Sequence, residues 1–288
     1  MSNLRTGVIG LGAMGAPMAR HLSAEGFLEG VWNRTVSKSV ALAADLGTWQ
    51  AESPSQLASR CDVLLVCVSA DKDLRSVVKQ SVSGLRTGSV FVDTSTVSPG
   101  VTTELAASLS GAGVEYIDAP VSGGVEGAIN GRLVAMVGGE LATFSRIRPV
   151  LETFSASVNH MGPVGSGQAT KAVNQVIVAG VAEAVCEALA LAEKLNLPQE
   201  RLLSVLTSGA ADGWFLRHRG QSMMENRFEK GFKLSLLLKD LEIVKSLARD
   251  LNISMPVVES AISDYAQLVA AGDGDNDISG LIRNKRQN

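Results

Sequence analysis

The chain has 288 residues, a length typical of two domains, and its net charge of −3 comes from mixed signs, which indicates no electrostatic partner such as nucleic acid. Its three cysteines and three histidines lack the spacing of metal ligands, so we predict no metal site and reduced thiols. Reduced thiols, together with a strand expected so near the first residue that no signal peptide fits before it, predict a cytoplasmic protein.

The first half of the chain alternates short β-rich segments with helical patterns, as βαβ units in a parallel sheet do. The expected strands cover residues 6–10, 30–33, 63–68, 89–93, 114–118, 133–138 and 157–161. A helix is expected over residues 13–25, directly after the first strand. We therefore predict an α/β domain over residues 1–163.

A glycine-rich motif follows the first expected strand and begins the first helix. It consists of Gly10, Leu11, Gly12, Ala13, Met14 and Gly15. Glycines at this spacing allow a tight turn and let backbone N–H groups at a helix N-terminus approach a pyrophosphate. The motif alone is weak evidence, but its place between strand and helix is the context that a dinucleotide site requires. These residues predict a Rossmann-type, dinucleotide-binding domain.

The second expected strand ends in Asn33, Arg34 and Thr35. An acidic residue at this point would bind the ribose 2′-hydroxyl of NAD, whereas a guanidinium can bind the 2′-phosphate of NADP. We predict that all three residues contact the cofactor and that NADPH is preferred over NADH. If Arg34 only faces water, the preference stays open.

The second half of the chain is predicted to be all-α, with helices at 168–194, 198–208, 212–225, 235–250 and 256–271. The first of these is apolar around most of its circumference, as buried helices are, and about 40 Å long. Charged and amide side chains interrupt its apolar run, so no membrane span is expected. We predict that this long interdomain helix joins the α/β domain to an all-α domain over residues 164–288. Lys285 and Arg286 are expected to form a solvated tail.

Lys171 lies near the start of the long helix, behind a glycine-rich segment at 162–167. Asn174 and Gln175 follow one turn later, so lysine and amides share a helix face. Burial lowers the pKa of a lysine and makes it able to exchange a proton with a substrate near neutral pH. Lys171 is therefore a candidate acid/base, and the alternative is a surface lysine at a helix start.

Five motifs together resemble the β-hydroxyacid dehydrogenases over nearly the whole chain. They are residues 10–15, Val92-Asp-Thr-Ser-Thr96, Asp118-Ala-Pro-Val-Ser-Gly-Gly124, the glycine-rich segment before Lys171, and Lys239-Asp-Leu241. This family includes 3-hydroxyisobutyrate dehydrogenases, tartronate semialdehyde reductases and glyoxylate/succinic semialdehyde reductases. The Asn33-Arg34-Thr35 ending is most similar to the NADPH-using reductases.

The resemblance implies roles for particular residues. It places a substrate carboxylate on Ser122, Gly123 and Gly124, the cofactor on Val68, Ser69, Thr96 and Lys239, and the catalytic role on Lys171. Two departures from the family pattern matter. First, Val68-Ser69 stands where family members commonly have Leu-Pro. Second, the family usually has an asparagine four residues after the lysine, whereas this chain has Gln175 at that position and its asparagine one residue earlier, at 174. Either Asn174 or Gln175 is therefore expected to contact the substrate.

The implied reaction interconverts a small carboxylate-bearing aldehyde, a semialdehyde or glyoxylate, and its hydroxy acid, with NADPH as reductant. The alternatives are an NAD-dependent 3-hydroxyisobutyrate-type dehydrogenase, an imine reductase and a non-catalytic NADP-binding module. Imine reductases usually carry another residue at the lysine position, and non-catalytic relatives tend to lose the lysine. The long apolar helix and the resemblance also predict a homodimer or homotetramer.

Overall fold

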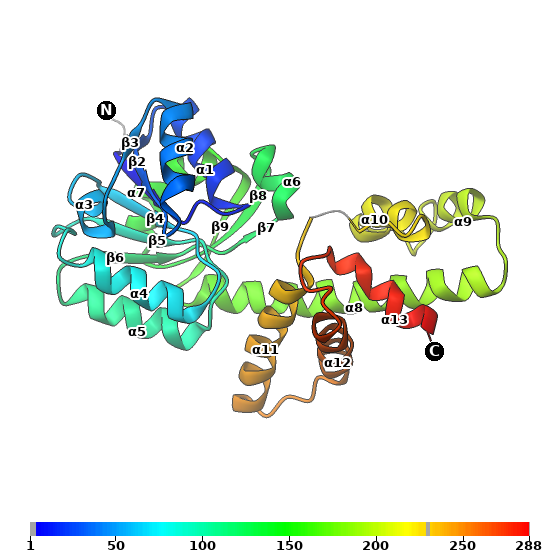
Figure 1. The fold of residues 1–288 in the computed structure, drawn as a ribbon. Coiled ribbons are helices and arrows are strands. Elements are labelled where there is room, and N and C mark those ends of the chain that lie inside the picture. Colours follow the sequence, from blue (N-terminus) through cyan, green and yellow to red (C-terminus); the bar gives the residue numbers. More distant parts are fainter. Residues whose placement is uncertain (1–3, 229–230, 288) are drawn as a thin grey trace. The chain divides into compact units, whose positions relative to one another are not determined.

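The computed structural model describes residues 4–228 and 231–287, which form two compact units that divide between Lys171 and Ala172 (Figure 1). This division falls after residue 171, whereas the sequence predicts it after residue 163. The difference arises because the first turn of helix α8 (Ser166–Lys194) is hydrogen-bonded to the α/β unit, as described below.

The α/β unit is built on one twisted sheet with the strand order β3-β2-β1-β4-β5-β6-β8-β7, and β9 pairs with β8. The strands are β1 (Thr6–Ile9), β2 (Leu28–Trp32), β3 (Trp49–Gln50), β4 (Val63–Val66), β5 (Val90–Asp93), β6 (Glu115–Asp118), β7 (Val121–Ser122), β8 (Leu133–Gly138) and β9 (Ser155–Gly162). From β3 to β6 all neighbours are parallel, as predicted, but β8 runs antiparallel to β6 and β7. The two-residue strands β3 and β7 were not predicted.

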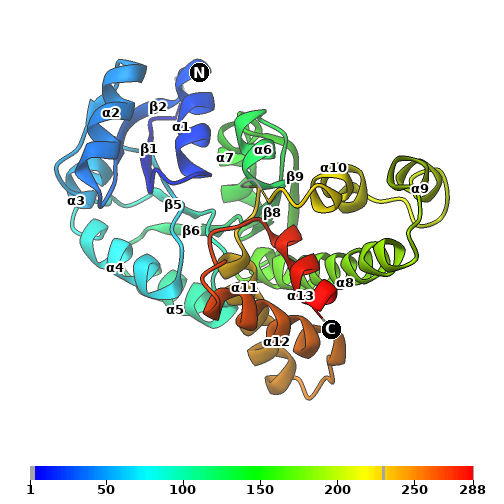
Figure 2. The same ribbon diagram turned by 45° about the vertical axis from the view of Figure 1, so that its right-hand side comes forward.

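Helices cover both faces of this sheet (Figure 1 and Figure 2). They are α1 (Gly15–Ala24), α2 (Val36–Leu46), α3 (Pro54–Ala58), α4 (Asp71–Ser81), α5 (Pro99–Ser110), α6 (Gly124–Ile129) and α7 (Leu141–Glu152). Strand residues alternate between two cores: Val8 packs with side chains of α1, α2 and α7, and Ile9 packs with those of α3, α4 and α5. Burial on both faces explains why these strands are continuous apolar runs.

The strand order reverses between β1 and β4, because the chain moves outward in one direction through β2 and β3 and in the other through β5 and β6. In open α/β sheets, ligands bind beyond the carboxyl ends of the strands at such a reversal. The glycine motif follows β1 and therefore lies at this point.

The second unit is helical, as predicted. From residue 172 it contains the rest of α8, then α9 (Gln199–Leu206), α10 (Trp214–Met224), α11 (Leu234–Asp250), α12 (Pro256–Ala270), the 3-10 turn η1 (Ile278–Leu281) and α13 (Ile282–Gln287). Its core joins buried residues of α8, such as Ala182 and Cys186, to Leu241 of α11 and Tyr265 of α12. After β9, the described residues contain one isolated bridge, Lys233 with Asp277, and no strand.

Helix α8 is the one helix in the described residues that is long and apolar enough to cross a membrane, judged by length and composition. Ala179, Ala182, Cys186 and Leu189 on this helix are fully buried in the core of the second unit. Packing of this kind is that of a core helix in a folded domain.

The expectation of a solvated tail at the chain's basic end was wrong. Lys285 Nζ lies 2.6 Å from Glu183 Oε2 and 2.7 Å from Asp264 Oδ2, and Arg286 pairs with Glu193. The acidic partners lie on α8 and α12, far from α13 in the sequence. Their ion pairs with Lys285 and Arg286 hold α13 in place. Glu183 is buried, and burial raises the pKa of its carboxyl, while Lys285 opposes that shift.

Candidate coenzyme and catalytic site

The three motif glycines meet different surroundings. Gly10 has φ +93°, and a Cβ there would collide with the carbonyl oxygen of Cys67. A Cβ on Gly15 would collide with the carbonyl oxygen of Gly10. Gly12 has no atom within 4 Å of the position its Cβ would take. The fold itself therefore requires glycine at 10 and 15, whereas Gly12 opens onto free space at the end of the sheet.

Asn33 fixes the glycine loop to the end of β2. Its Oδ1 accepts a hydrogen bond from Leu11 N at 2.9 Å, and its Nδ2 donates to the carbonyl oxygen of Thr35 at 3.0 Å. Both amide atoms are thus committed to the protein backbone. This side chain shapes the loop that sequence reasoning expects to hold the cofactor.

Arg34 projects from the same strand end and pairs with an acid. Its Nη1 lies 2.8 Å from Oδ1 of Asp73, in the first turn of α4, and 83% of the Arg34 side chain is exposed. The guanidinium is therefore in water, as the alternative interpretation holds, and it is also paired with a carboxylate 39 residues away.

The loops after β4 and β5 are tied together beside the glycine loop. Val68 N donates to Ser95 Oγ at 2.9 Å, and Val68 Cγ1 lies 3.5 Å from the position of a Cβ on Gly10. Thr96 follows Ser95 directly and is half-buried. The structure thus brings the segments after β1, β2, β4 and β5 to one edge of the sheet.

The expected substrate loop begins where β7 ends. Ser122 is half-buried and pairs with Val134 of β8, and the next two residues have positive φ, +128° at Gly123 and +63° at Gly124. Glycine adopts such angles at little cost. The chain therefore turns sharply into α6, and Gly123 in this turn is exposed.

Two buried carboxylates stand side by side where β5 and β6 end, because Asp93 and Asp118 are register partners. Burial raises the pKa of Asp93 to about 7, although Ser95 N, 2.9 Å from its Oδ1, and Tyr116 Oη, 3.3 Å from its Oδ2, donate hydrogen bonds to it. Burial also raises the pKa of Asp118. Its two oxygens accept from backbone N–H groups of the α8 N-terminus, Gly165 at 2.7 Å and Gln168 at 2.9 Å.

Lys171 is buried, with 7% of its surface exposed, which confirms the predicted burial. It is the sixth residue of α8, and the helical turn before it carries Gln168. The Gln168 side chain donates to the carbonyl oxygen of Ser95 at 2.8 Å and accepts from Val97 N at 3.2 Å. The start of the lysine helix is thereby bound to the loop that carries Thr96.

In the second unit the two amides after the lysine differ in their partners. Gln175 is 1% exposed, and its Nε2 donates to Asp240 Oδ2 at 2.7 Å. Asn174 is half-buried and donates to Gln175 Oε1 at 2.8 Å. Lys239 Nζ lies 2.9 Å from the other oxygen of Asp240. Asp240 thus links Lys239 and Gln175, and Gln175 in turn fixes Asn174.

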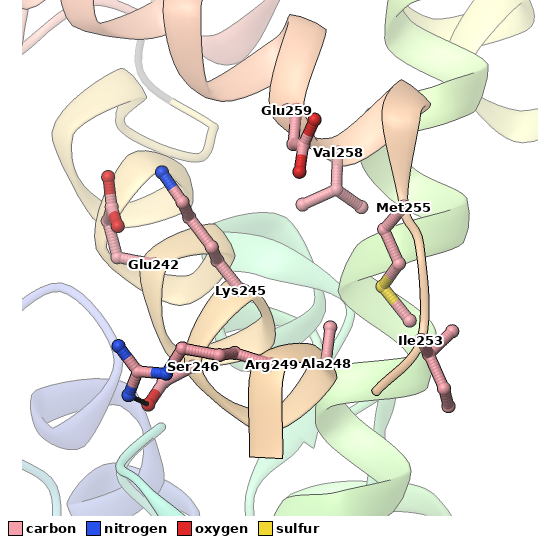
Figure 3. Close-up of a pocket in the computed structure, with 9 residues that line it drawn as sticks. All are labelled: Glu242, Lys245, Ser246, Ala248, Arg249, Ile253, Met255, Val258 and Glu259. Atoms are coloured by element: carbon pink, nitrogen blue, oxygen red, sulfur yellow. Dashed lines mark hydrogen bonds between the residues drawn. The ribbon is translucent and has the colours of Figure 1, made fainter. Parts of the chain in front are cut away.

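A cavity of about 410 Å³ lies between α11 and α12 in the second unit (Figure 3). Its lining carries both signs of charge and consists of Glu242, Lys245, Ser246, Ala248, Arg249, Ile253, Met255, Val258 and Glu259. None of these is a predicted site residue. The described residues also contain no group of three His, Cys, Asp or Glu side chains that could hold a metal ion.

Comparison with known proteins bears on this arrangement. Residues 5–162 match the model described as the NAD binding domain of 6-phosphogluconate dehydrogenase. Residues 165–284 match the NAD-binding region of NADP-dependent 3-hydroxyisobutyrate dehydrogenase. The 2-hydroxy-3-oxopropionate reductase of Escherichia coli is 32% identical over 283 residues, 97% of this chain and 96% of the relative.

Solved structures agree with these matches. The 3-hydroxyisobutyrate dehydrogenase of Mycobacterium tuberculosis with L-serine superposes with a TM-score of 0.89 and 31% identity, covering 99% of this chain and all of that one. The structure of Psf3 in complex with NADP⁺ and 2-OPP has a TM-score of 0.86 and 27% identity, over 96% of this chain and 99% of its own. The chain belongs to the β-hydroxyacid dehydrogenase family. It is an NAD(P)-dependent oxidoreductase of the hydroxyacid dehydrogenase type.

The residues of the α/β unit fit the dinucleotide that this family uses. A Cβ on Gly12 would fill the space before the N-terminus of α1, where backbone N–H groups can receive a pyrophosphate. Asn33 accepts a hydrogen bond from Leu11 N in this loop, and the segment that carries Val68 borders the loop and is hydrogen-bonded to Ser95, next to Thr96.

Sequence reasoning missed four polar residues that hold predicted site residues in place within their own units: Asp73, Asp118 and Gln168 in the α/β unit, and Asp240 in the helical unit. Asp118 and Asp240 lie inside the motifs at residues 118–124 and 239–241. A signal for them was available, because a carboxylate in an apolar strand or helix needs a buried partner. Asp73 and Gln168 carry no local signal, because their partners are distant in sequence.

Proposed function

We propose that the protein reduces the aldehyde of a small carboxylate-bearing substrate, a semialdehyde or glyoxylate, to the hydroxy acid with NADPH. The observation that carries this proposal is the burial of Lys171 one helical turn after the contact between α8 and the Thr96 loop. A lysine in that place can serve as the acid and base of a carbonyl reaction. The similarity to 2-hydroxy-3-oxopropionate reductase supports a carboxylate-bearing aldehyde.

NADPH, when bound, supplies the hydride, and the remaining steps belong to the protein. Protonated Lys171 donates a hydrogen bond from Nζ to the aldehyde oxygen and transfers its proton there as negative charge develops. In the oxidative direction neutral Lys171 removes the hydroxyl proton. The Ser122 hydroxyl and the backbone N–H groups of Gly123 and Gly124 bind the substrate carboxylate and orient it.

Of the two amides after the lysine, Asn174 is the proposed substrate contact. Gln175 is nearly inaccessible, and Asp240 accepts a hydrogen bond from its amide nitrogen. Gln175 therefore acts by fixing Asn174, whose amide donates to it. Lys239 is proposed to reach the cofactor from its position beside Asp240.

NADPH preference is proposed on the ending of β2, which offers the guanidinium of Arg34 and no acidic residue for a ribose 2′-hydroxyl. The similarity to Psf3, whose structure contains NADP⁺, supports this choice. Thr35 and the backbone after Val68 and Ser69 complete the proposed cofactor contacts.

Replacement of the lysine tests the catalytic role. In Lys171→Ala, kcat should fall by about 10²–10⁴-fold, the usual contribution of general acid/base catalysis, while the Kd for NADPH stays nearly unchanged. Stopped-flow single turnovers and fluorescence titration measure the two quantities. Lys245→Ala, on the cavity side of α11, is the matched control and should keep normal turnover. Near-normal kcat in Lys171→Ala would refute the proposal.

A substrate panel separates the remaining activities. Glyoxylate and succinic, tartronate and methylmalonate semialdehydes are reduced with NADPH or NADH, and 3-hydroxyisobutyrate is oxidised with NADP⁺ or NAD⁺. The similarity to a 3-hydroxyisobutyrate dehydrogenase makes oxidation of 3-hydroxyisobutyrate the main alternative. A kcat/KM that is highest for a semialdehyde with NADPH supports the proposal, and one that is highest for 3-hydroxyisobutyrate with NAD⁺ replaces it.

A further inference from the structure

Gln168 is a buried polar residue to which the proposed reaction assigns no role. It is 2% exposed and belongs to the first turn of α8, within the α/β unit. Its Nε2 donates to Ser95 O, and its Oε1 accepts from Val97 N, so one amide binds the backbone on both sides of Thr96. A buried amide with both ends satisfied fixes the separation of the segments it joins.

Ser95 extends this network toward the glycine loop. Its Oγ accepts from Val68 N, and its own N–H donates to buried Asp93. Thr94, one residue earlier, donates its N–H to Val66 O at the end of β4. Hydrogen bonds therefore join the loops after β4 and β5, and the Gln168 side chain joins the loop after β5 to α8.

The same helical turn is held from its other side by its backbone. Asp118 accepts hydrogen bonds from the N–H groups of Gly165 and Gln168. A Cβ on Gly167 would collide with the carbonyl oxygen of Met136 and lie 2.7 Å from Asp118 Oδ2. The first turn of α8 thus packs directly against β6 and β8.

Lys171 follows Gln168 by three residues, so the two share a helix face one turn apart. We infer that Gln168 is a positioning residue: it sets the place of Lys171 relative to the Thr96 loop, against which the coenzyme is proposed to bind. This inference depends on the proposed acid/base role of Lys171. Its physical basis is that proton and hydride transfer need reacting atoms in contact geometry, and a displacement of about 1 Å can cost about 10²-fold in rate.

A double-mutant cycle tests the inference, with Gln168→Met made in the natural protein and in Lys171→Ala. Methionine keeps the length of the side chain and removes both hydrogen bonds. If Gln168 acts through Lys171, the change lowers kcat by about 10–100-fold in the natural protein and by less than about threefold when the lysine is absent. The primary isotope effect with 4-deuterated NADPH should rise, because hydride transfer becomes rate-limiting.

Gln80→Met is the matched control, because the Gln80 amide donates only to Ser76 of the same helix among the contacts in the structure. Gln168→Glu, which retains an acceptor for Val97 N–H, replaces the methionine variant if that variant does not fold. The inference is overturned if Gln168→Met lowers kcat equally in the natural protein and in Lys171→Ala. It is also overturned if Gln168→Met lowers the kcat of the natural protein by no more than about threefold. Failure of the proposed function is distinct, because Lys171→Ala alone would then retain its turnover.

Discussion

Within the glycine motif, Gly10 and Gly15 are required by the fold, whereas Gly12 is expected to be required only for binding of the cofactor. A Cβ at this position meets no protein atom, so Gly12→Ala should leave Tm nearly unchanged, yet it should raise the Kd for NADPH about tenfold or more because the methyl group lies where the pyrophosphate approaches. Calorimetry and fluorescence titration measure the two effects. Gly10→Ala is the contrast: its φ of +93° alone costs about 1–3 kcal/mol of stability.

Unchanged NADPH affinity in Gly12→Ala would contradict the placement of the pyrophosphate at this loop. A large fall in Tm for the same variant would contradict the open surroundings of Gly12 in the structure. The two readouts are independent, so either finding can be recognised without the other.

Asp73 is expected to be a second determinant of the proposed coenzyme preference, because it pairs with Arg34. Its carboxylate competes with a 2′-phosphate for the Arg34 guanidinium, so Asp73→Asn should lower the KM for NADPH a few-fold and leave that for NADH unchanged. Stability should change by less than about 1 kcal/mol, because the Arg34 guanidinium is in water and ion pairs with an exposed partner contribute little. Arg34→Asp should erode any preference for NADPH. A weaker affinity for NADPH in Asp73→Asn would show instead that Asp73 orients Arg34 for binding.

Asp93, buried at the end of β5, is expected to make the stability of the folded protein depend on pH. Because its folded-state pKa is raised from 3.8 to about 7, the protonated carboxyl is favoured in the folded protein. The stability this provides is present below about pH 4 and is lost as pH rises toward 7. Asp93→Asn should therefore become more stable relative to the natural protein between pH 4 and 7, as measured by urea unfolding.

Asparagine suits the site, because its oxygen can accept from Ser95 N and its NH₂ group can donate to Tyr116 Oη. Asp118, whose pKa is also raised, is present in both proteins, so the difference between them reports the titration of Asp93 together with its electrostatic coupling to Asp118. A stability difference that is constant across this pH range would contradict the raised pKa.

The elements that sequence predicts well are those with a long apolar signal. Strands such as β4 and helices such as α8 and α12 bury continuous or periodic apolar residues, and these were found within a few residues of the expected bounds. The two-residue strands β3 and β7 are too short to show a period. Half of the residues of helix α13 are charged, and the helix is held by ion pairs to α8 and α12 that only the folded chain forms.

The candidate site likewise contains residues that the sequence predicts and contacts that it does not. The glycine loop, the ends of β2, β4 and β5, and Lys171 follow from motifs and from the rule that ligands bind at strand ends. The pairings of Arg34 with Asp73 and of Gln168 with Ser95 could not be predicted, because they join segments 39 and 73 residues apart through single hydrogen-bonding groups. Such contacts leave no periodic trace in the sequence.

At the scale of the whole molecule, one face of α8 remains apolar and exposed along most of the helix. It is formed by Val173, Ile177, Val181, Ala184, Ala188, Leu191 and, just beyond the helix, Leu195. Spacings of three and four residues align these side chains in a stripe, as at a helix–helix contact. The stripe supports the proposed homodimer or homotetramer, in which a second copy covers it.

A charge in this stripe tests the assembly. Ile177→Glu places a carboxylate in the middle of the apolar face and should lower the mass measured by light scattering toward that of one chain. Leu251→Glu, at the exposed end of α11, is the matched control and should leave the mass unchanged. A natural protein that scatters only as a monomer would contradict the proposal.

The hydrogen bonds from the start of α8 to Asp118 determine where the chain can be cut. A protein truncated after residue 162, where the first matched region ends, would leave the Asp118 carboxylate in an apolar interior without its donors at Gly165 and Gln168. We therefore expect an α/β unit produced alone to require the following nine residues, through Lys171. Any exchange of helical domains between relatives should join the two sequences after this lysine, so that each α/β unit keeps the first turn of its own α8 and the hydrogen bonds to Asp118.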